Sequence, residues 1–321
     1  MSHRLIQVKI AFLGILQMDT NLTRINSLKK QKKILVLAHN YQPPEIQDAA
    51  DFVGDSLDLA IKATKTDADV IVFCGVSFMA EAAKILNPNK TVVLPDPTAT
   101  CPMANMVTPT ELRALKSKHP NAAVMAYINT NADVKALADI CCTSANGVDV
   151  ARSLPQKEII FVPDKNLGAY IQTQVPEKTM ILWPGYCHTH QDILPEDIKK
   201  IKTAHPKAEV LVHPECRPEV IALADHAFST NGMVSYAKTS PATEFIIGTE
   251  QGLCYRLQKE NPGKHFYPIG KAYCPNMKKI TIEKLINSME TLEPEVHLPD
   301  TIMHQAKIPL QRMMDLGRKT P

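Results

Sequence analysis

A repeat of about 87 residues constrains the fold of this chain more than any other feature. An apolar run, a His or Tyr, an Ala-Asp pair and a hydroxyl residue recur three times in the same order, in copies that begin at Val36, Val124 and Val210. Self-similarity at a fixed period marks repeated structural units. We therefore predict three related units, not the two domains that a length of 321 residues suggests.

The second half of each copy repeats as well. A β-branched or aromatic run is followed by a stretch of helical periodicity, a Pro-x-Lys motif and a further apolar run that leads to Cys101, Cys187 or Cys274. Helices that alternate with buried apolar strands are typical of parallel sheets. We predict an α/β fold of three pseudo-threefold-related, three-layer αβα domains, with three strands per copy, each cysteine at a strand end, and the active site at the common interface.

The period also predicts where the domains begin and end. We expect a first domain from residues 1–101 together with 275–321, a second from 102–187 and a third from 188–274. Residues 1–18 contain a short apolar run after two basic residues, but no small-residue cleavage site follows it. We therefore expect this segment to be an N-terminal extension rather than a signal peptide.

Charge and composition exclude several classes of protein. The chain has 36 basic and 33 acidic residues, and its net charge of +3 is too weak to suggest a nucleic-acid partner. No apolar stretch approaches the roughly 20 residues of a membrane span. Eight cysteines in so long a chain, with none in a CxxC pair, do not form a disulfide scaffold. We expect free thiols and a cytoplasmic protein.

Reactive side chains gather at the predicted strand ends. Ligands of open parallel sheets bind at the carboxyl ends of the strands. The first strand of each copy ends at one of three triplets, which are His39-Asn-Tyr41, Tyr127-Ile-Asn129 and His213-Pro-Glu215. Threefold symmetry would bring these triplets and the three cysteines of the repeat to one cavity. We expect a catalytic site there.

Three cysteines without a fourth equivalent favour an iron–sulfur cluster over zinc. Structural zinc sites nearly always have four ligands, whereas cysteine thiolates also hold [4Fe–4S] clusters. With three thiolates, one iron keeps an open position and can act as a Lewis acid in dehydration. The alternative is a set of three buried structural thiols. His190 follows Cys187 by three residues, so it either faces the cluster or belongs to the core.

Three hydroxyl residues of the repeat, Ser56, Ser144 and Thr230, precede helix-like stretches. Ser and Thr are preferred helix N-caps, so we expect three capping residues. Three helix N-termini aimed at one cavity would also form an anion site suited to a phosphate.

The motifs together resemble the quinolinate synthase family, the A proteins of de novo NAD biosynthesis. The similarity covers roughly residues 20–315 and rests on motifs in matching order: His39-Asn-Tyr-Gln42, Gly54-Asp-Ser56, Tyr127-Ile-Asn-Thr130, Cys187-His-Thr-His190, His213-Pro-Glu-Cys216, Ser229-Thr230 and Cys274-Pro-Asn-Met-Lys278. One departure is the sequence Lys271-Ala-Tyr-Cys274, where some family members carry a CxxC redox pair.

The resemblance implies an activity and a site. The implied reaction condenses iminoaspartate with dihydroxyacetone phosphate to quinolinate, with release of phosphate and water. The implied cofactor is a [4Fe–4S] cluster on Cys101, Cys187 and Cys274. It also implies a functional link to an aspartate oxidase or dehydrogenase. The implied substrate-contacting positions are His39, Tyr41, Ser56, Tyr127, Asn129, Ser144, His190, His213, Glu215 and Thr230.

We assign roles to these residues as hypotheses. Glu215 is the expected general base, since a partly dry cavity can raise a carboxyl pKa toward neutrality. The expected proton carriers are His39, Tyr41 and His213, and His190 is a further expected catalytic residue. The expected substrate-binding residues are Ser56, Tyr127, Asn129, Ser144 and Thr230.

Three other functions stay open at this point. They are a different [4Fe–4S] hydro-lyase acting on a phosphorylated or dicarboxylic acid, an iron–sulfur sensor, and a binding protein of repeated α/β domains that holds no metal.

Overall fold

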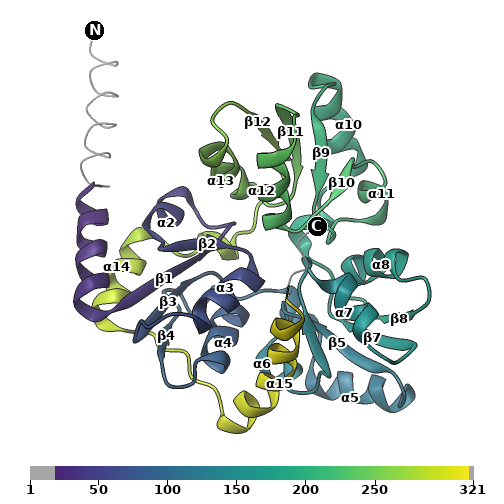
Figure 1. Ribbon diagram of the computed structural model, residues 1–321, viewed down its shortest axis with the longest axis horizontal. Coiled ribbons are helices and arrows are strands. Elements are labelled where there is room, and N and C mark those ends of the chain that lie inside the picture. Colours follow the sequence, from purple (N-terminus) through teal and green to yellow (C-terminus); the bar gives the residue numbers. More distant parts are fainter. Residues whose placement is uncertain (1–18, 318–321) are drawn as a thin grey trace.

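The computed structural model describes residues 19–317, which form three lobes around a common centre (Figure 1). Each lobe contains one four-stranded sheet in which every strand pairing is parallel. The strand orders are β2-β1-β3-β4, β6-β5-β7-β8 and β10-β9-β11-β12. The predicted α/β class with three parallel sheets is confirmed. The predicted N-terminal extension, residues 1–18, lies outside the described residues.

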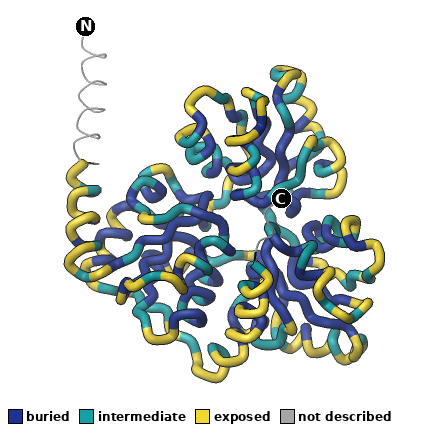
Figure 2. The backbone as a smooth tube through the Cα atoms, viewed as in Figure 1, coloured by how far each residue is buried: buried dark blue, intermediate teal, exposed yellow. Residues whose placement is uncertain are grey.

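The first lobe combines both ends of the described chain. Its sheet contains β1 (Ile34–His39), β2 (Phe52–Gly54), β3 (Val70–Cys74) and β4 (Thr91–Val93). Its helices are residues 19–32, α2 (Pro44–Ala49), α3 (Ser56–Thr64), α4 (Ser77–Leu86) and α14 (Ile282–Thr291). Every residue of β3 is buried, as expected for a strand with helices on both faces of its sheet (Figure 2).

The second lobe repeats this arrangement. Its strands are β5 (Ala123–Tyr127), β6 (Ile140–Cys142), β7 (Glu158–Val162) and β8 (Thr179–Leu182). Its helices are the 3-10 turn η1 (Met103–Met106), α5 (Pro109–Lys118), α6 (Ala132–Lys135), α7 (Gly147–Ser153) and α8 (Lys165–Gln174).

The third lobe repeats it again. Its strands are β9 (Glu209–Val212), β10 (His226–Ala227), β11 (Glu244–Gly248) and β12 (His265–Pro268). Its helices are α9 (His188–Gln191), α10 (Pro195–Ala204), α11 (Pro218–Ile221), α12 (Thr230–Thr239), α13 (Leu253–Glu260) and the turn η2 (Asn276–Lys278).

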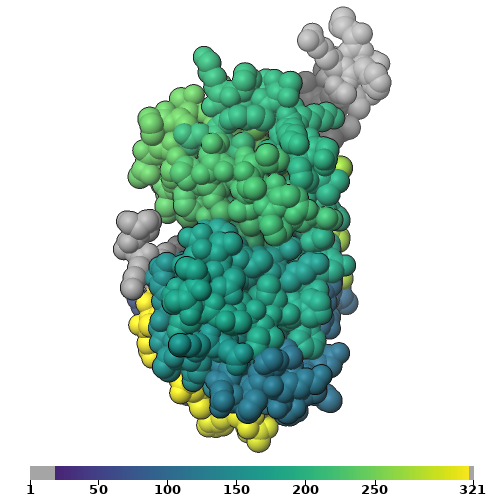
Figure 3. Space-filling view, turned by 90° about the vertical axis from the view of Figure 1, so that its right-hand side faces the viewer, coloured from purple at the N-terminus to yellow at the C-terminus, as the bar shows by residue number. Residues whose placement is uncertain are grey.

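The last helix, α15 (Asp300–Leu316), contacts two lobes. It packs on α4 of the first lobe and on β6 and α6 of the second. A side view shows it in yellow along the lower part of the molecule, below the green third lobe (Figure 3).

The domain boundaries drawn from the period stay a prediction. None of the described helices is long and apolar enough to cross a membrane.

Two details of the predicted units are wrong. Each sheet has four strands rather than three, because β2, β6 and β10 contain only two or three residues and are too short to show a periodic pattern. The strands that lead to the three cysteines also end earlier than predicted, at Val93, Leu182 and Pro268. A loop therefore carries each cysteine.

The repeated Ala-Asp pairs fix the first long strand of each sheet. In every lobe the aspartate Oδ2 accepts the backbone N–H of a strand valine, and the aspartate N–H donates to the carbonyl of the same valine. The pairs are Asp51 with Val36, Asp139 with Val124, and Asp225 with Val210, with N–H to Oδ2 distances of 2.8, 2.7 and 2.7 Å. This motif is therefore structural.

The repeated Pro-x-Lys motifs have a similar role. Each lysine Nζ donates to two backbone carbonyls in the segment before the second long strand. The donors are Lys90, Lys178 and Lys264, and the acceptors are Thr66 and Ala68, Leu154 and Gln156, and Ala237 and Ser240. Each lysine thus satisfies carbonyls that no strand partner reaches.

Replacing Asp139 with alanine should destabilise the second lobe, because the buried N–H of Val124 would lose its side-chain acceptor. We expect a loss of about 1–3 kcal/mol in the free energy of unfolding, measured by denaturant titration. Asp69→Ala is the control, since that carboxylate is largely exposed and pairs only with exposed Lys33. Equal effects of the two substitutions would contradict the structural role of the motif.

Candidate functional site

The carboxyl ends of the strands of all three sheets meet at one cavity. All thirteen residues predicted for the site line it: His39, Tyr41, Ser56, Cys101, Tyr127, Asn129, Ser144, Cys187, His190, His213, Glu215, Thr230 and Cys274. They come from strand ends, helix starts and loops that are far apart in the sequence and adjacent only because the lobes share a centre. The roles assigned to them stay predictions.

The three cysteines of the repeat have the same local setting. Each lies just before a single helical turn, and each sulfur accepts the backbone N–H of the third residue after it, which is Ala104, His190 or Met277. Burial nevertheless raises the pKa of all three thiols, that of Cys101 to about 12. The N–H donors are suited to thiolates, but a cation must compensate the buried negative charge.

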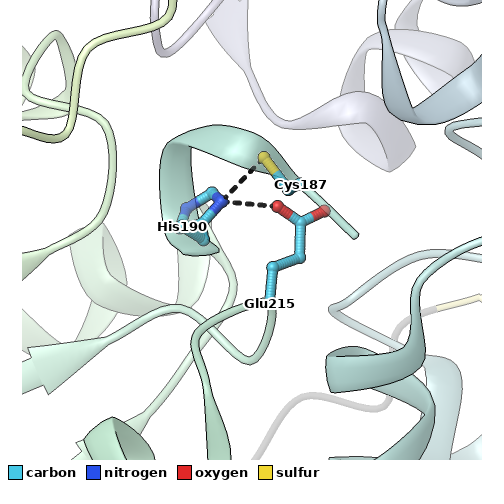
Figure 4. Close-up of side chains that lie close together, drawn as sticks. All are labelled: Cys187, His190 and Glu215. Carbon is cyan, nitrogen blue, oxygen red and sulfur yellow. Dashed lines mark hydrogen bonds and ion pairs between the residues drawn. The ribbon is translucent and has the colours of Figure 1, made fainter. Parts of the chain in front are cut away.

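The spacing of the sulfurs excludes a single ion shared by all three thiols. Within residues 19–317, the group of ligand atoms that all lie within 4.8 Å of one another consists of Cys187, His190 and Glu215 (Figure 4). The three cysteine sulfurs do not form such a group. Two thiolates on one zinc ion are at most about 4.6 Å apart, because each Zn–S bond is about 2.3 Å long. The three thiols therefore do not all meet on one ion.

A chain of hydrogen bonds crosses the cavity wall. His190 Nδ1 lies 2.7 Å from Glu215 Oε2 and 3.2 Å from Cys187 Sγ (Figure 4). On the other side of the ring, His190 Nε2 lies 2.8 Å from Thr249 Oγ1, which is 2.6 Å from the Tyr41 hydroxyl. Thr249 directly follows β11 and is not among the residues predicted for the site. Its position directly after a strand is the sequence signal that could have placed it among the site residues.

Two histidines of the repeat are oriented by the same local bond. The backbone N–H of Tyr41 donates to His39 Nδ1, and that of Glu215 donates to His213 Nδ1, both at 3.2 Å. Nδ1 is thus an acceptor in each neutral ring, so Nε2 carries the proton and in His213 donates to Ser144 Oγ at 3.1 Å. Burial is the main cause that lowers the pKa of both imidazoles to about 3.

The expected upward pKa shift of Glu215 is wrong. Burial by itself raises the pKa of this carboxyl, but the imidazoles of His190 and His213 outweigh burial and lower the pKa to about 2. Glu215 is therefore an ionised partner of His190. The sequence could not show this result, because the sign of the shift depends on which side chains face the carboxylate.

The hydroxyls predicted as helix caps are not the caps. Asp55 caps α3 and Ser229 caps α12, while Asn146 precedes α7 without a side-chain cap. Ser56 and Thr230 are instead the first residues of α3 and α12, and Thr230 Oγ1 accepts a hydrogen bond from Asn40 Nδ2 at 2.8 Å. A neighbour takes over the capping role, and the hydroxyls of the repeat line the cavity.

The cavity offers neutral donors and two acceptors that need partners. No lysine or arginine within the described residues 19–317 is among those lining it. Two buried oxygens, Glu215 Oε1 and Asn129 Oδ1, have no hydrogen-bond partner. Such atoms are costly unless a ligand satisfies them, so the site is suited to a ligand with N–H or O–H groups.

The two lowered imidazole pKa values predict how stability depends on pH. An unfolded histidine binds a proton near pH 6.5, whereas folded His39 and His213 stay neutral down to about pH 3. The free energy of unfolding of the metal-free protein should therefore fall when pH is lowered from about 7 to about 5. His39→Asn should make this fall smaller. An NMR titration of the His39 ring with a midpoint near 6.5 would contradict the prediction.

Comparison with known proteins gives consistent matches. Residues 23–315 match a family described as "Quinolinate synthetase A protein". A protein named "Quinolinate synthase" from Thermodesulfovibrio yellowstonii is 54% identical over 293 residues, which cover 91% of this chain and 97% of that relative. Proteins of the same name from Dehalococcoides mccartyi and Methanoregula boonei are 54% and 53% identical, over 91% and 90% of this chain and 96% of each relative.

Proposed function

We propose a reaction for this chain on the premise that it belongs to the quinolinate synthetase A protein family. The chain is accordingly an enzyme of NAD biosynthesis. The reaction proposed here is the condensation of iminoaspartate with dihydroxyacetone phosphate to quinolinate, with release of phosphate and water. The observation that supports it most is that thirteen residues from three lobes line one cavity.

We propose that Cys101, Cys187 and Cys274 hold a [4Fe–4S] cluster. Their N–H···S bonds support this assignment, and their sulfurs are too far apart for all three to share one ion. When bound, such a cluster supplies a Lewis acid at the iron without a protein ligand, which helps a hydroxyl leave as water.

The hydroxyls of Ser56, Ser144 and Thr230 are proposed to bind the phosphate of the triose. Since the cavity is not lined by lysine or arginine among the described residues, neutral donors must recognise the anion. His213 already donates to Ser144 Oγ, which leaves the serine O–H to point elsewhere. Asn129 Oδ1 is an acceptor suited to the imine or amine N–H of the other substrate. Tyr127 lines the same cavity as a neutral donor whose hydroxyl is next to Glu215.

Proton transfer is proposed to follow the chain from Glu215 to Tyr41. The ionised Glu215 favours a proton on His190 Nδ1, and Thr249 connects His190 Nε2 to the Tyr41 phenol. A proton taken from substrate carbon at one end can then be returned to a leaving hydroxyl at the other without bulk water. The neutral imidazole of His39 serves as a donor to developing negative charge, and His213 acts through Ser144, to which its Nε2–H donates.

The substrate chemistry implies a supplier. Iminoaspartate is an imine that water hydrolyses, so an aspartate oxidase or dehydrogenase must form it for this enzyme. All eight cysteines, which lie within residues 19–317, are unpaired, which supports a reducing, cytoplasmic setting.

Cysteine variants test the proposed cluster and reaction together. Protein purified without oxygen should contain about four irons per chain and form pyridine dicarboxylate from the two substrates. Cys101→Ala, Cys187→Ala and Cys274→Ala should each lose the iron and the product. Cys74→Ala is the matched control, since this thiol is buried within β3. Full iron content in all three variants would refute the ligand set.

The phosphate site has its own test. Thr230→Val removes the hydroxyl at nearly constant volume, and Thr230→Ser keeps it. A hydrogen bond to a charged group contributes about 1.5–3 kcal/mol, so the valine variant should raise KM for the triose phosphate at least about tenfold. The serine variant should stay close to the parent. Equal KM values for valine and serine would remove Thr230 from the phosphate site.

A further inference from the structure

Two fully buried carboxylates, Asp164 and Glu250, have no part in the proposed reaction. Both have no exposed surface. They occupy equivalent places in their lobes, two residues after the ends of β7 and β11. Buried carboxylates are costly unless hydrogen bonds satisfy both oxygens, so their partners indicate their role.

Asp164 divides its two oxygens between a helix and a cysteine. Oδ1 accepts the backbone N–H groups of Asn166 and Leu167, at 2.8 and 2.9 Å, and so caps α8. Oδ2 accepts the backbone N–H of Cys187 at 3.2 Å. One side chain thus connects the start of a helix to a proposed cluster ligand.

Glu250 makes the same connection in the third lobe. Its Oε2 accepts the backbone N–H of Gly252 at 2.7 Å, immediately before α13. Its Oε1 accepts the backbone N–H of Cys274 at 3.2 Å, and Lys278 Nζ lies 3.0 Å from the carboxylate. The pattern recurs although one residue is an aspartate and the other a glutamate.

The first lobe has a valine in this place. Val76 follows the end of β3 by two residues and provides no side-chain cap to α4. All three lobes do share one backbone hydrogen bond near this place. The residue that follows Val76, Asp164 or Glu250 donates its N–H to the carbonyl of the residue two positions before the cysteine. These bonds are Ser77 to Ala99, Lys165 to Gly185, and Gln251 to Ala272, at 2.8, 2.9 and 2.9 Å. The carboxylate is thus an addition at two cysteines, and Val76 offers Cys101 no equivalent acceptor.

We propose that Asp164 and Glu250 are positioning residues that hold the backbone of Cys187 and Cys274 in the geometry needed for the metal cluster. The inference rests on the proposed function, because it takes these cysteines as ligands. Groups that orient metal ligands in this way typically change metal affinity 10–100-fold when they are replaced. Two of the three ligands are therefore fixed by a side chain, and the third by its loop backbone.

The test compares isosteric variants of the full, cluster-loaded protein under anaerobic conditions. Asp164→Asn and Glu250→Gln each keep one acceptor oxygen, although N–H groups donate to both oxygens of the carboxylate. Asp164→Ser keeps a cap for α8 but has no second oxygen for Cys187. We expect all three variants to release iron to a ferrous chelator about 10–100-fold faster than the parent.

The matched control is Asp139→Asn. This carboxylate also accepts a backbone N–H in the second lobe, but from a strand residue and not from a cysteine loop. Iron release should stay at the parent rate in this variant, although its thermal midpoint falls. Asp164→Asn and Asp164→Ser should release iron fast at temperatures where the metal-free forms remain folded.

The outcomes separate this inference from the proposed function. Parent-like iron release in Asp164→Asn and Glu250→Gln would overturn the positioning role, as would equally fast release in Asp139→Asn. If Cys187→Ala and Cys274→Ala retain all iron, the proposed cluster itself fails. If the cysteine variants lose iron and the carboxylate variants do not, the positioning inference alone is wrong.

Discussion

The direction of the strands is the constraint on which this site depends. In a parallel sheet with right-handed crossovers, all carboxyl ends lie on one edge, so the loops that follow them emerge on one side. Three such sheets face a common centre (Figure 1). Residues as distant in sequence as Tyr41 and Thr249 consequently meet within hydrogen-bond distance. The Ala-Asp and Pro-x-Lys motifs contribute by fixing the first two long strands of each unit.

Burial then determines the charge state of the groups that meet there. Removing His39 and His213 from water favours their neutral forms, so they act as donors rather than cations. Glu215 is equally buried, yet it remains ionised because His190 and His213 lie against it. The cavity therefore combines neutral donors, three thiols and one ionised carboxylate that lies against His190. Its wall can donate hydrogen bonds to a ligand and exchange protons with it.

The three units share a backbone plan but are not chemically equivalent. The capping role moved from the repeated hydroxyls to Asp55 and Ser229, because a side chain one position earlier reaches the helix N–H groups better. The acceptor for the cysteine N–H is present in the second and third lobes, and Val76 takes its place in the first lobe. The two unlike substrates proposed for this chain would need such differences, since a symmetric cavity would present the same groups from each lobe.

The sequence alone determined the number of units and their α/β class, because period and strand pattern are local properties that the chain carries in order. The repeat singled out the three cysteines, and the repeat and the family resemblance together indicated thirteen of the residues that line the cavity. Only the tertiary structure decided the pKa direction of Glu215, the chain through Thr249 and the anchoring of Cys187 and Cys274 by Asp164 and Glu250. These depend on distances between side chains of different elements. Such distances are set by packing and leave no periodic trace in the sequence.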